Sequence, residues 1–322
     1  MAKISDVAAL AGVSPAAVSR VLSGDAGIRV SAATRQRVIA AARELDYVPN
    51  HTARSLRTSR TSTIALVVPD VTSAVFAELA RGAELEAASR GLAIVLAGAE
   101  QLQRDSDWLR RLVSEGRIDG VILQLPDGAS PSFSPNGTPI VVINSVDGGE
   151  LSTIVLDDAA GIQVAVDHLR SLGHSSIGFV GGLPGSATGQ RRLAGFTTSE
   201  RSEWVTDFGY TGADGRAAAA ALIARGPLPT ALVVANLNAA LGVLAEIHAN
   251  GLRVPDDVSI VAMHDVWYAD ATWPPITTVK MPLAELGAAA VAMLIDAPDV
   301  VEHRVIATPS PQLIVRQSTA PR

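Results

Sequence analysis

From Thr63 onward, short apolar runs alternate with longer stretches of helical periodicity. The runs are TIALVVPD (63–70), LAIVLAG (92–98), DGVILQLP (119–126), PIVVIN (139–144), SIGFVGG (176–182), TALVVAN (230–236) and VSIVAMHD (258–265). Helical patterns such as AVFAELARGAELEAASRG (74–91) and GIQVAVDHLRSLG (161–173) separate most of them. Continuous apolar strands alternating with helices are typical of parallel sheets covered on both faces. The sequence therefore predicts an α/β fold with doubly wound parallel sheets.

Residues 1–49 differ, because they show three short helical patterns and no strand-like run. Ser5 or Asp6 is positioned to cap the first helix. The positions of this helix expected to face inward are Val7, Leu10 and Ala11. Gly12 suits the turn that follows, because glycine takes positive φ without steric cost.

The second helical pattern is capped by Ser14 and has Pro15 at its first position, where the missing N–H does no harm. Its inward-facing positions are Val18, Val21 and Leu22. Ala16, Ser19 and Arg20 then face outward near its start. The third pattern is capped by Ser31 and buries Val38, Ala42 and Leu45.

Two short helices joined by a glycine-containing turn form the helix-turn-helix unit, whose second helix enters the DNA major groove by its N-terminal end. In that groove Arg20 can pair with guanine O6 and N7, and Ala16 offers a methyl group to thymine. The alternative is a small three-helix bundle with another role.

The charge is unevenly distributed along the chain. Residues 1–60 carry nine lysines and arginines against four acids, a net charge of +5. The remaining residues carry 17 basic against 28 acidic side chains, or −11, within a total of −6. A basic head on an acidic body predicts a polyanionic partner for the head alone.

The segment NHTARSLRTSR (50–60) joins the two parts and carries one large apolar residue, Leu56, between Arg54 and Arg57. An inert spacer gives no reason for these residues.

Composition excludes several classes of protein. The 322 residues include no cysteine, so neither a disulfide framework nor a thiolate metal site forms. The start MAKISDVAAL lacks the basic and apolar regions of a signal peptide, and no run approaches membrane-spanning length. We therefore expect a cytoplasmic protein.

Polar residues follow several of the predicted strands, where parallel sheets bind ligands. They are Asp70, Gln124, Asn144, Asn236, His264 and Asp265, a set suited to a small hydroxylated ligand. The glycine-rich GGLPGSATG (181–189) matches no phosphate-binding spacing and is interpreted as a strand-to-helix turn. The adjacent pairs Asp157–Asp158 and Asp256–Asp257 are interpreted as caps and turns. With no catalytic or dinucleotide motif, no enzyme, cofactor or metal is expected.

ISDVAALAGVSPAAVSRVLSG followed by VSAATRQRVIAAARELDYVPN resembles the DNA-binding headpiece of the lactose-repressor (LacI/GalR) family of bacterial regulators. The resemblance extends to LIVRQST near the end of the chain. It implies a headpiece over 1–49, a hinge helix over 50–60 that orders on operator DNA, and a two-lobed, periplasmic-binding-protein-like domain over 61–322. That domain dimerises and binds a small effector, commonly a sugar. In the hinge, Leu56 matches the leucine that wedges into the central base step. An apolar wedge of this kind unstacks the step at a cost of a few kcal/mol and bends the duplex. A lone helix of this length is unstable in water, so the hinge would order only with its partner and DNA.

On this basis the expected DNA-contacting residues are Ser14, Pro15, Ala16, Ser19, Arg20, Arg29, Ser31, Tyr47, Asn50, Arg54 and Leu56. The operator is expected to be palindromic with a central C-G step. The expected effector-binding residues are Phe76, Gln124, Asn144, Arg192, Tyr210, Asn236, His264 and Asp265. Among these, Arg192 in RRLAGF matches an arginine that holds the effector's polar groups, and Tyr210 matches a stacking aromatic.

Two departures from the family pattern affect the effector site. Asn144 and His264 stand where the family usually has aspartates, so the site has lost two carboxylates. A histidine near neutral pH can carry charge, which leaves room for an anionic ligand such as a sugar acid or phosphate. Between Gly195 and Trp204 the chain is shorter than the family's, so one wall of the effector lobe is expected to be trimmed.

The leading interpretation is a dimeric transcriptional repressor whose operator affinity is controlled by a small molecule. A transport-type sugar-binding protein is one alternative, which the headpiece and the missing signal peptide oppose. An enzyme on a doubly wound fold is another, because fold does not fix function.

Overall fold

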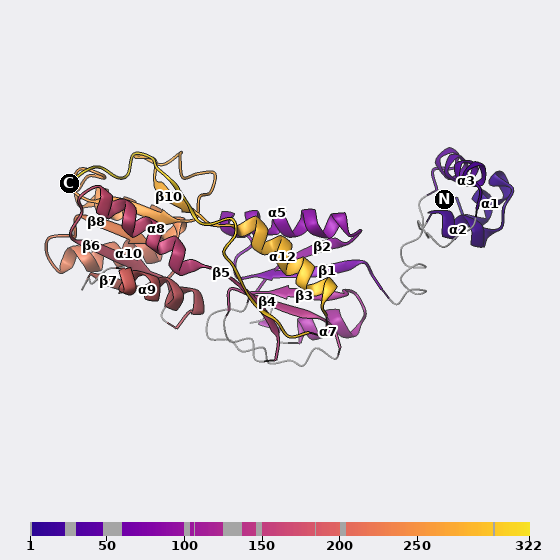
Figure 1. Ribbon diagram of the computed structural model, residues 1–322, viewed down its shortest axis with the longest axis horizontal. Coiled ribbons are helices and arrows are strands. Elements are labelled where there is room, and N and C mark those ends of the chain that lie inside the picture. The colour runs from indigo at the N-terminus through magenta and orange to yellow at the C-terminus, as the bar shows by residue number, and fades with distance from the viewer. Residues whose placement is uncertain are drawn as a thin grey trace. The chain divides into compact units, whose positions relative to one another are not determined.

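The computed structural model of the protein describes residues 2–22, 30–47, 60–99, 104–105, 107–124, 137–145, 150–183, 185–199, 204–298 and 300–322. The chain divides into two compact units, Met1–Thr61 and Ser62–Arg322. We call them the headpiece and the regulatory unit. The described part of the headpiece is helical, and the regulatory unit is α/β (Figure 1). Most of the predicted hinge, with Arg54 and Leu56, lies outside the described residues.

The headpiece contains α1 (Ile4–Ala11), α2 (Pro15–Leu22) and α3 (Ala32–Glu44). Their shared core is built from Val7, Ala8, Ala11, Val18, Val21, Val38, Ala41 and Ala42. Helices α1 and α2 meet at a bend of 100°, and Gly12 between them has a φ of +65°. The guanidinium Nε of Arg37 on α3 donates to the carbonyl of Ala11 at 3.2 Å, which fixes the third helix to the first.

Two expectations for the first helix were wrong. Leu10 is 48% exposed, and Ala8 takes the inward position instead. The helix begins at Ile4, one turn earlier than a cap at Asp6 requires. The Asp6 carboxylate instead accepts the backbone N–H of Lys3 at 2.8 Å, so it satisfies a free donor from inside the first turn.

The regulatory unit has two lobes, each built on a six-stranded sheet. In the first lobe all neighbouring strands are parallel, in the order β11 (His303–Ile306), β5 (Ser152–Leu156), β4 (Ile140–Ile143), β3 (Gly120–Leu123), β1 (Thr63–Val68) and β2 (Ala93–Gly98). The helices that pack on it are α5 (Ala74–Ser89), α7 (Trp108–Ser114) and α12 (Leu283–Asp296).

The second lobe is parallel except for its antiparallel edge strand. Its order is β12 (Gln312–Ile314), β10 (Thr277–Lys280), β9 (Ser259–Met263), β8 (Ala231–Val234), β6 (Ile177–Gly181) and β7 (Val205–Asp207). The helices that pack on it are α8 (Asp158–Ser171), α9 (Ala187–Ser199), α10 (Gly212–Ala224) and α11 (Leu237–Ala249).

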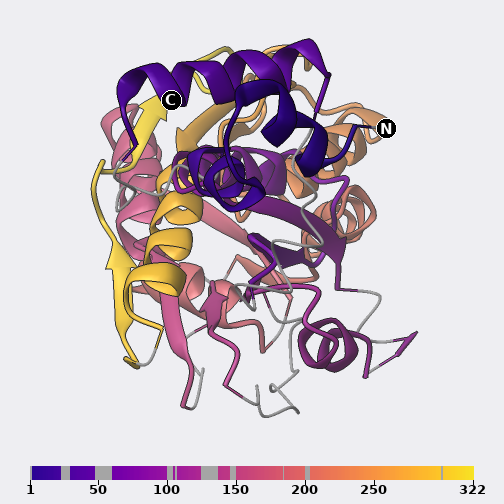
Figure 2. The ribbon, with the colours of Figure 1, turned by 90° about the vertical axis from the view of Figure 1, so that its right-hand side faces the viewer.

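Three segments connect the lobes: β5 to α8, β10 to α12, and β11 to β12. Figure 2 shows the last of these in yellow along one side of the regulatory unit. Helices α5 and α12 pack very closely, because a Cβ added at Gly82 would lie 2.0 Å from the carbonyl oxygen of Ala284. Glycine is therefore required at that helix contact.

The predicted doubly wound α/β fold is confirmed, and all seven apolar runs contain a strand. Strands β5, β7, β10, β11 and β12 were not among the predicted runs. Strands β11 and β12 have mostly exposed or half-buried residues, so they lack the continuous apolar signal of a buried strand.

Candidate functional site

The N-terminal end of α2 is the exposed candidate DNA-reading surface of the headpiece. The hydroxyl of Ser14 accepts the backbone N–H of Ala17 at 3.2 Å and so caps the helix. Pro15, Ala16 and Arg20 are exposed, and Ser19 is half-buried. The side chains that the sequence predicts for base contacts thus lie on the open face of the helix, while Val18 and Val21 hold the opposite face in the core.

The other predicted DNA-contacting residues are placed around this helix or lie outside the described residues. Ser31 caps α3 by accepting the N–H of Thr34 at 3.2 Å, and its own position is exposed. Tyr47 packs against the headpiece core. Arg29 and Asn50, like Arg54 and Leu56, fall outside the described residues.

In the regulatory unit, Asp158 and two adjacent arginines form an ion-pair cluster, in which Asp158 and Arg192 are buried and Arg191 is half-buried. The Asp158 carboxylate, 1% exposed, accepts Nε of Arg192 at 2.8 Å and Nε of Arg191 at 2.9 Å. Asp158 begins α8, directly after the β5-to-α8 crossing between the lobes, whereas both arginines lie on α9. The close packing of α8 and α9 brings the three charges together; a Cβ at Gly195 would lie 2.8 Å from Cα of Ala159.

Arg192 also donates hydrogen bonds to the residues that follow two strands of the second lobe. Its Nη1 donates to the carbonyl of Ala235 after β8 at 2.5 Å, and its Nη2 donates to Nε2 of His264 after β9 at 2.8 Å. Because a guanidinium can only donate, Nε2 of His264 accepts and the imidazole proton lies on Nδ1. Burial, reinforced by the Arg192 charge, holds the pKa of His264 well below its usual value of 6.5.

This geometry corrects the expectation that His264 carries charge near neutral pH. The side chain is 3% exposed and faces a cation, so protonation there would add a second buried positive charge. Its Nδ1 is buried and, within the described part of the chain, has no hydrogen-bond partner. The φ of His264 is +71°, a conformation rare for a bulky residue and often found where a side chain is held for function.

The first lobe reaches the same cluster through Asn144, which follows β4. Its carbonyl accepts from Oγ1 of Thr188 at 3.2 Å and from Nη2 of Arg191 at 3.3 Å, so α9 of the second lobe is bonded to the first. Its side-chain amide donates to Oε1 of Gln124 at 2.9 Å. Asn144, Gln124, Arg192 and His264 are thus brought to one junction between the lobes.

The remaining predicted effector residues have internal roles. Asn236 caps α11 by accepting the N–H of Ala239 at 2.7 Å and donates to the carbonyl of Tyr210 at 3.0 Å. The Tyr210 hydroxyl lies 3.0 Å from Oγ of Ser186. Asp265 accepts Nη2 of Arg316 at 2.7 Å, and Phe76 is half-buried on α5 against the core.

Sequence reasoning missed Asp158 and Arg191. Asp157 does cap α8, accepting the N–H of Ala160 at 3.0 Å, as interpreted. Its neighbour Asp158 is not a cap but the centre of the ion-pair cluster. The available signal was the pair of consecutive arginines in RRLAGF, because any arginine that packing buries requires an anion.

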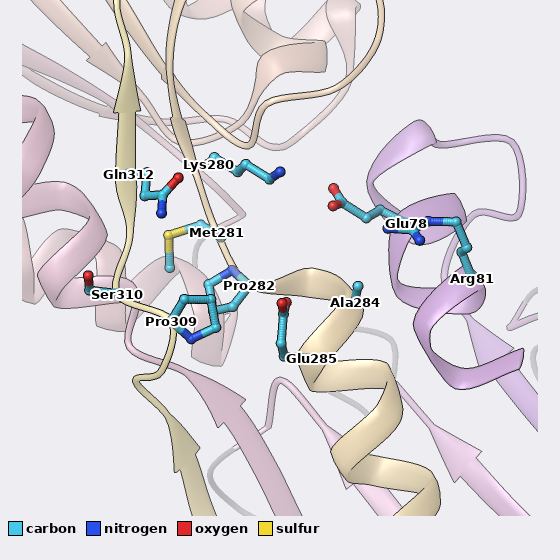
Figure 3. Close-up of a pocket in the computed structure, with 10 residues that line it drawn as sticks. All are labelled: Glu78, Arg81, Lys280, Met281, Pro282, Ala284, Glu285, Pro309, Ser310 and Gln312. Atoms are coloured by element: carbon cyan, nitrogen blue, oxygen red, sulfur yellow. The ribbon is translucent and has the colours of Figure 1, made fainter. Parts of the chain in front are cut away.

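A separate pocket of about 150 Å³ lies where α5 meets the β10-to-α12 crossing and contains none of the predicted residues (Figure 3). Glu78 and Lys280 point toward one another across it (Figure 3). Burial raises the pKa of Glu78, and Lys280 and Arg81 offset part of that rise.

Among the described residues, no cluster of histidine, aspartate and glutamate could hold a metal ion. In the same part of the chain no single helix is long and apolar enough to cross a membrane. The pair α1 and α2, bent by 100°, passes that test by length and composition only.

Residues 3–50 match the family model of bacterial regulatory proteins, lacI family, and residues 166–319 match a periplasmic binding protein-like domain. The HTH-type transcriptional repressor PurR of Photobacterium profundum is 31% identical over 99% of this chain and 98% of its own length. A crystal structure of the lac repressor dimer bound to operator and an anti-inducer aligns with a TM-score of 0.80 at 26% identity over 99% of both chains. The complex of the transcriptional regulator CelR with cellobiose aligns with a TM-score of 0.71 at 28% identity, covering 99% of this chain and 100% of that one.

Proposed function

The chain belongs to the lacI family of bacterial regulatory proteins, and we propose that it is a homodimeric repressor that binds a palindromic operator under the control of a sugar-like effector. The family assignment makes it a DNA-binding transcriptional regulator and not an enzyme. The observation that carries the finer proposal is the capped N-terminus of α2, which exposes Ala16 and Arg20 on a headpiece of net charge +5.

The proposed reading of DNA follows from this helix. Its exposed end fits the major groove, where Arg20 pairs with guanine and Ala16 contacts a thymine methyl group. In a dimer, two such helices read two half-sites, so the operator is palindromic. The paired Leu56 side chains then kink the central C-G step, and Arg54 and Arg57 flank the wedge within the basic head.

The proposed effector site is the junction of the lobes around Arg192 and His264. Several observations support it. Polar groups at the ends of β3, β4, β8 and β9 converge there, as ligand-binding groups do in doubly wound sheets; they are the side chains of Gln124, Asn144 and His264 and the carbonyl of Ala235. His264 and Asn144 both take positive φ at this point. A sugar or sugar derivative is the proposed class, in line with the cellobiose complex of the related CelR.

Dimerisation is proposed through apolar residues that the single chain leaves open to solvent. On the edge strand β2, Val95 and Leu96 are 47% and 45% exposed, and Leu85 on the neighbouring α5 is 63% exposed. In the second lobe Trp267 and Trp273 are about four-fifths exposed. An uncovered apolar edge strand favours pairing with a second chain. A dimeric regulator of chromosomal DNA would act in the cytoplasm.

The test of DNA binding is its salt dependence, measured by fluorescence anisotropy of labelled duplex with the full-length protein. Each phosphate that the headpiece neutralises contributes about 0.9 to the slope of log K against log salt. We expect log K to fall by several units for each unit rise in log salt concentration, because binding weakens at high salt. A transport-type binding protein would give no binding, and a nearly flat dependence would remove the proposed function.

A further inference from the structure

One carboxylate serves two guanidiniums in the ion-pair cluster. Asp158 accepts from Arg191 and from Arg192, and among the described residues it is the one acid that pairs with either. The imidazole of His264 is neutral because it accepts from Arg192. The cluster therefore holds an excess of one positive charge in a largely buried place, where an uncompensated charge is costly.

Two donors of this cluster are buried without partners. They are Nη1 of Arg191 and Nδ1 of His264, and neither has an acceptor within the described part of the chain. A buried donor left unsatisfied costs about as much as a lost hydrogen bond, so such atoms are rare unless something else fills the role. The missing groups are thus an acceptor and a negative charge.

Among the described residues, the neighbouring acids supply neither one. Asp157 is directed to the N–H of Ala160 at the start of α8, and Asp265 is paired with Arg316. Asn144 and Gln124, which close the cluster from the first lobe, are neutral and bonded to each other. The positive charge of the cluster therefore remains available to a ligand.

We propose that Arg191 is the anion-binding residue of the effector site, and that it holds a carboxylate or phosphate group of the effector together with the Nδ1–H of His264. This inference rests on the proposed function, because it takes the effector to bind at this junction. The ligand's anionic oxygens accept from the two unpartnered donors and balance the excess charge. Arg191 was not among the residues predicted to bind effector, and here it decides the class of ligand.

Arg191 also connects the ligand to the arrangement of the lobes. Its Nη2 donates to the carbonyl of Asn144 in the first lobe, while its Nε is held by Asp158 in the second. An anion bound to Nη1 fixes the guanidinium in this bridging position, because a third hydrogen-bonded partner restricts the rotation of the planar group. Binding of the anion thus favours the lobe arrangement in which this bridge is made.

The test is thermal unfolding of the full-length protein with four probes at constant ionic strength, adjusted with sodium chloride. The probes are inorganic phosphate, glucose, glucuronate and glucose 6-phosphate. Specific binding raises the unfolding temperature with probe concentration by mass action. We expect at least one of the three anions to raise it well above the effect of chloride, and glucose to raise it less. Comparing the rise in unfolding temperature with glucuronate and with the two phosphate probes distinguishes a carboxylate site from a phosphate site.

The variants Arg191→Gln and Arg253→Gln make the test specific. Arg253 is an arginine of the same lobe with a side chain 70% exposed, so its loss should leave the anion response intact. Arg191→Gln should remove most of the response, although Asp158 stays paired with Arg192 and the charge of the cluster is balanced. Anion binding by the headpiece is common to both variants and cancels in the comparison.

An equal anion response in wild type and Arg191→Gln overturns the proposal, as does stabilisation by glucose alone or by none of the probes. If Arg191→Gln does not fold, the wild-type comparison of glucose with the three anions still decides. Operator binding by the same wild-type preparation is measured separately. Operator binding without an anion response contradicts this site only, whereas an anion response without operator binding contradicts the proposed function.

Discussion

Arg192 donates from Nη2 to Nε2 of His264 across 2.8 Å, and this bond fixes the protonation state of a histidine at the junction of the lobes. The histidine is 3% exposed, and its guanidinium partner is itself held by Asp158 and the Ala235 carbonyl. Because the Arg192 guanidinium is held in place beside the imidazole, a positive charge on His264 is disfavoured and the neutral imidazole is the stable form. The charged His264 that the sequence analysis allowed near neutral pH is therefore not expected, and neither is an effector affinity that depends on its protonation.

The bond predicts instead how the folded protein responds to acid. Because the pKa of His264 is lowered on folding, the unfolded chain takes up a proton below pH 6.5 while the folded protein does not. Stability is complete above pH 6.5 and falls as pH drops toward the folded pKa, by at most about 1.4 kcal/mol per pH unit for this group. Denaturant unfolding at pH 8.0 and pH 5.5 measures this change in the free energy of unfolding.

The control for this prediction is His264→Gln, which keeps a polar side chain but does not titrate. His168 and His174 also have pKa values lowered by burial, so the variant should lose less stability than wild type but not become pH-independent. The same loss in both proteins would mean that His264 is protonated in the folded state.

Arg20→Ala tests base readout by the headpiece. Arg20 is exposed near the start of α2, and a bidentate pair with guanine contributes about 1–3 kcal/mol of discrimination per half-site. The variant should bind operator more weakly and tolerate any base at one position of each half-site. Competition binding with single-base operator variants measures this. A variant equally weakened on all sequences would place Arg20 on phosphate.

Leu56→Ser tests the predicted wedge. The side chain acts only at a kinked step, whereas phosphate contacts form on any sequence. The variant should therefore lose most discrimination between operator and random DNA and retain non-specific binding and dimerisation. Leu10→Ser, at an exposed leucine of α1, should keep the discrimination. Equal weakening of Leu56→Ser on operator and random DNA would contradict the wedge.

Gly82→Ala tests the packing of α5 on α12. The added Cβ would lie 2.0 Å from the Ala284 carbonyl oxygen, so the helices must separate, at a cost of about 1–3 kcal/mol. Gly212→Ala is the matched control, because its nearest neighbour would be the Asn238 carbonyl oxygen at 3.7 Å. Urea unfolding should show a clear loss for the first and little change for the second. Equal stabilities would mean that the helices can adjust freely.

The sequence predicted the parts of the fold that local chemistry determines. Continuous apolar runs identified seven strands but not the buried β5 and β10, and Gly12, Ser14 and Pro15 identified the turn and second helix of the headpiece. Leu10 was misplaced because Ala8 and Leu10 lie on opposite sides of one short helix and only packing decides between them. The edge strands β11 and β12 were missed because partner strands, and not their own apolar content, define them.

The candidate site was less predictable, because its chemistry depends on contacts between distant residues. His264, Arg192 and Asn144 could be selected from strand ends and from the family resemblance. The charge state of His264 could not, since it follows from a hydrogen bond over 72 positions of sequence. Asp158 and Arg191 were missed for the same reason: the packing of α8 on α9 creates their ion pair.

Selection of binding sites from random duplex DNA by the full-length protein tests directly whether it reads a palindromic operator. One palindromic site with a C-G step at its centre should be enriched. Binding to this site should exceed binding to random DNA by at least about a thousandfold at physiological salt. Enrichment of no sequence, or of a site without two-fold symmetry, would contradict a dimeric, sequence-specific repressor.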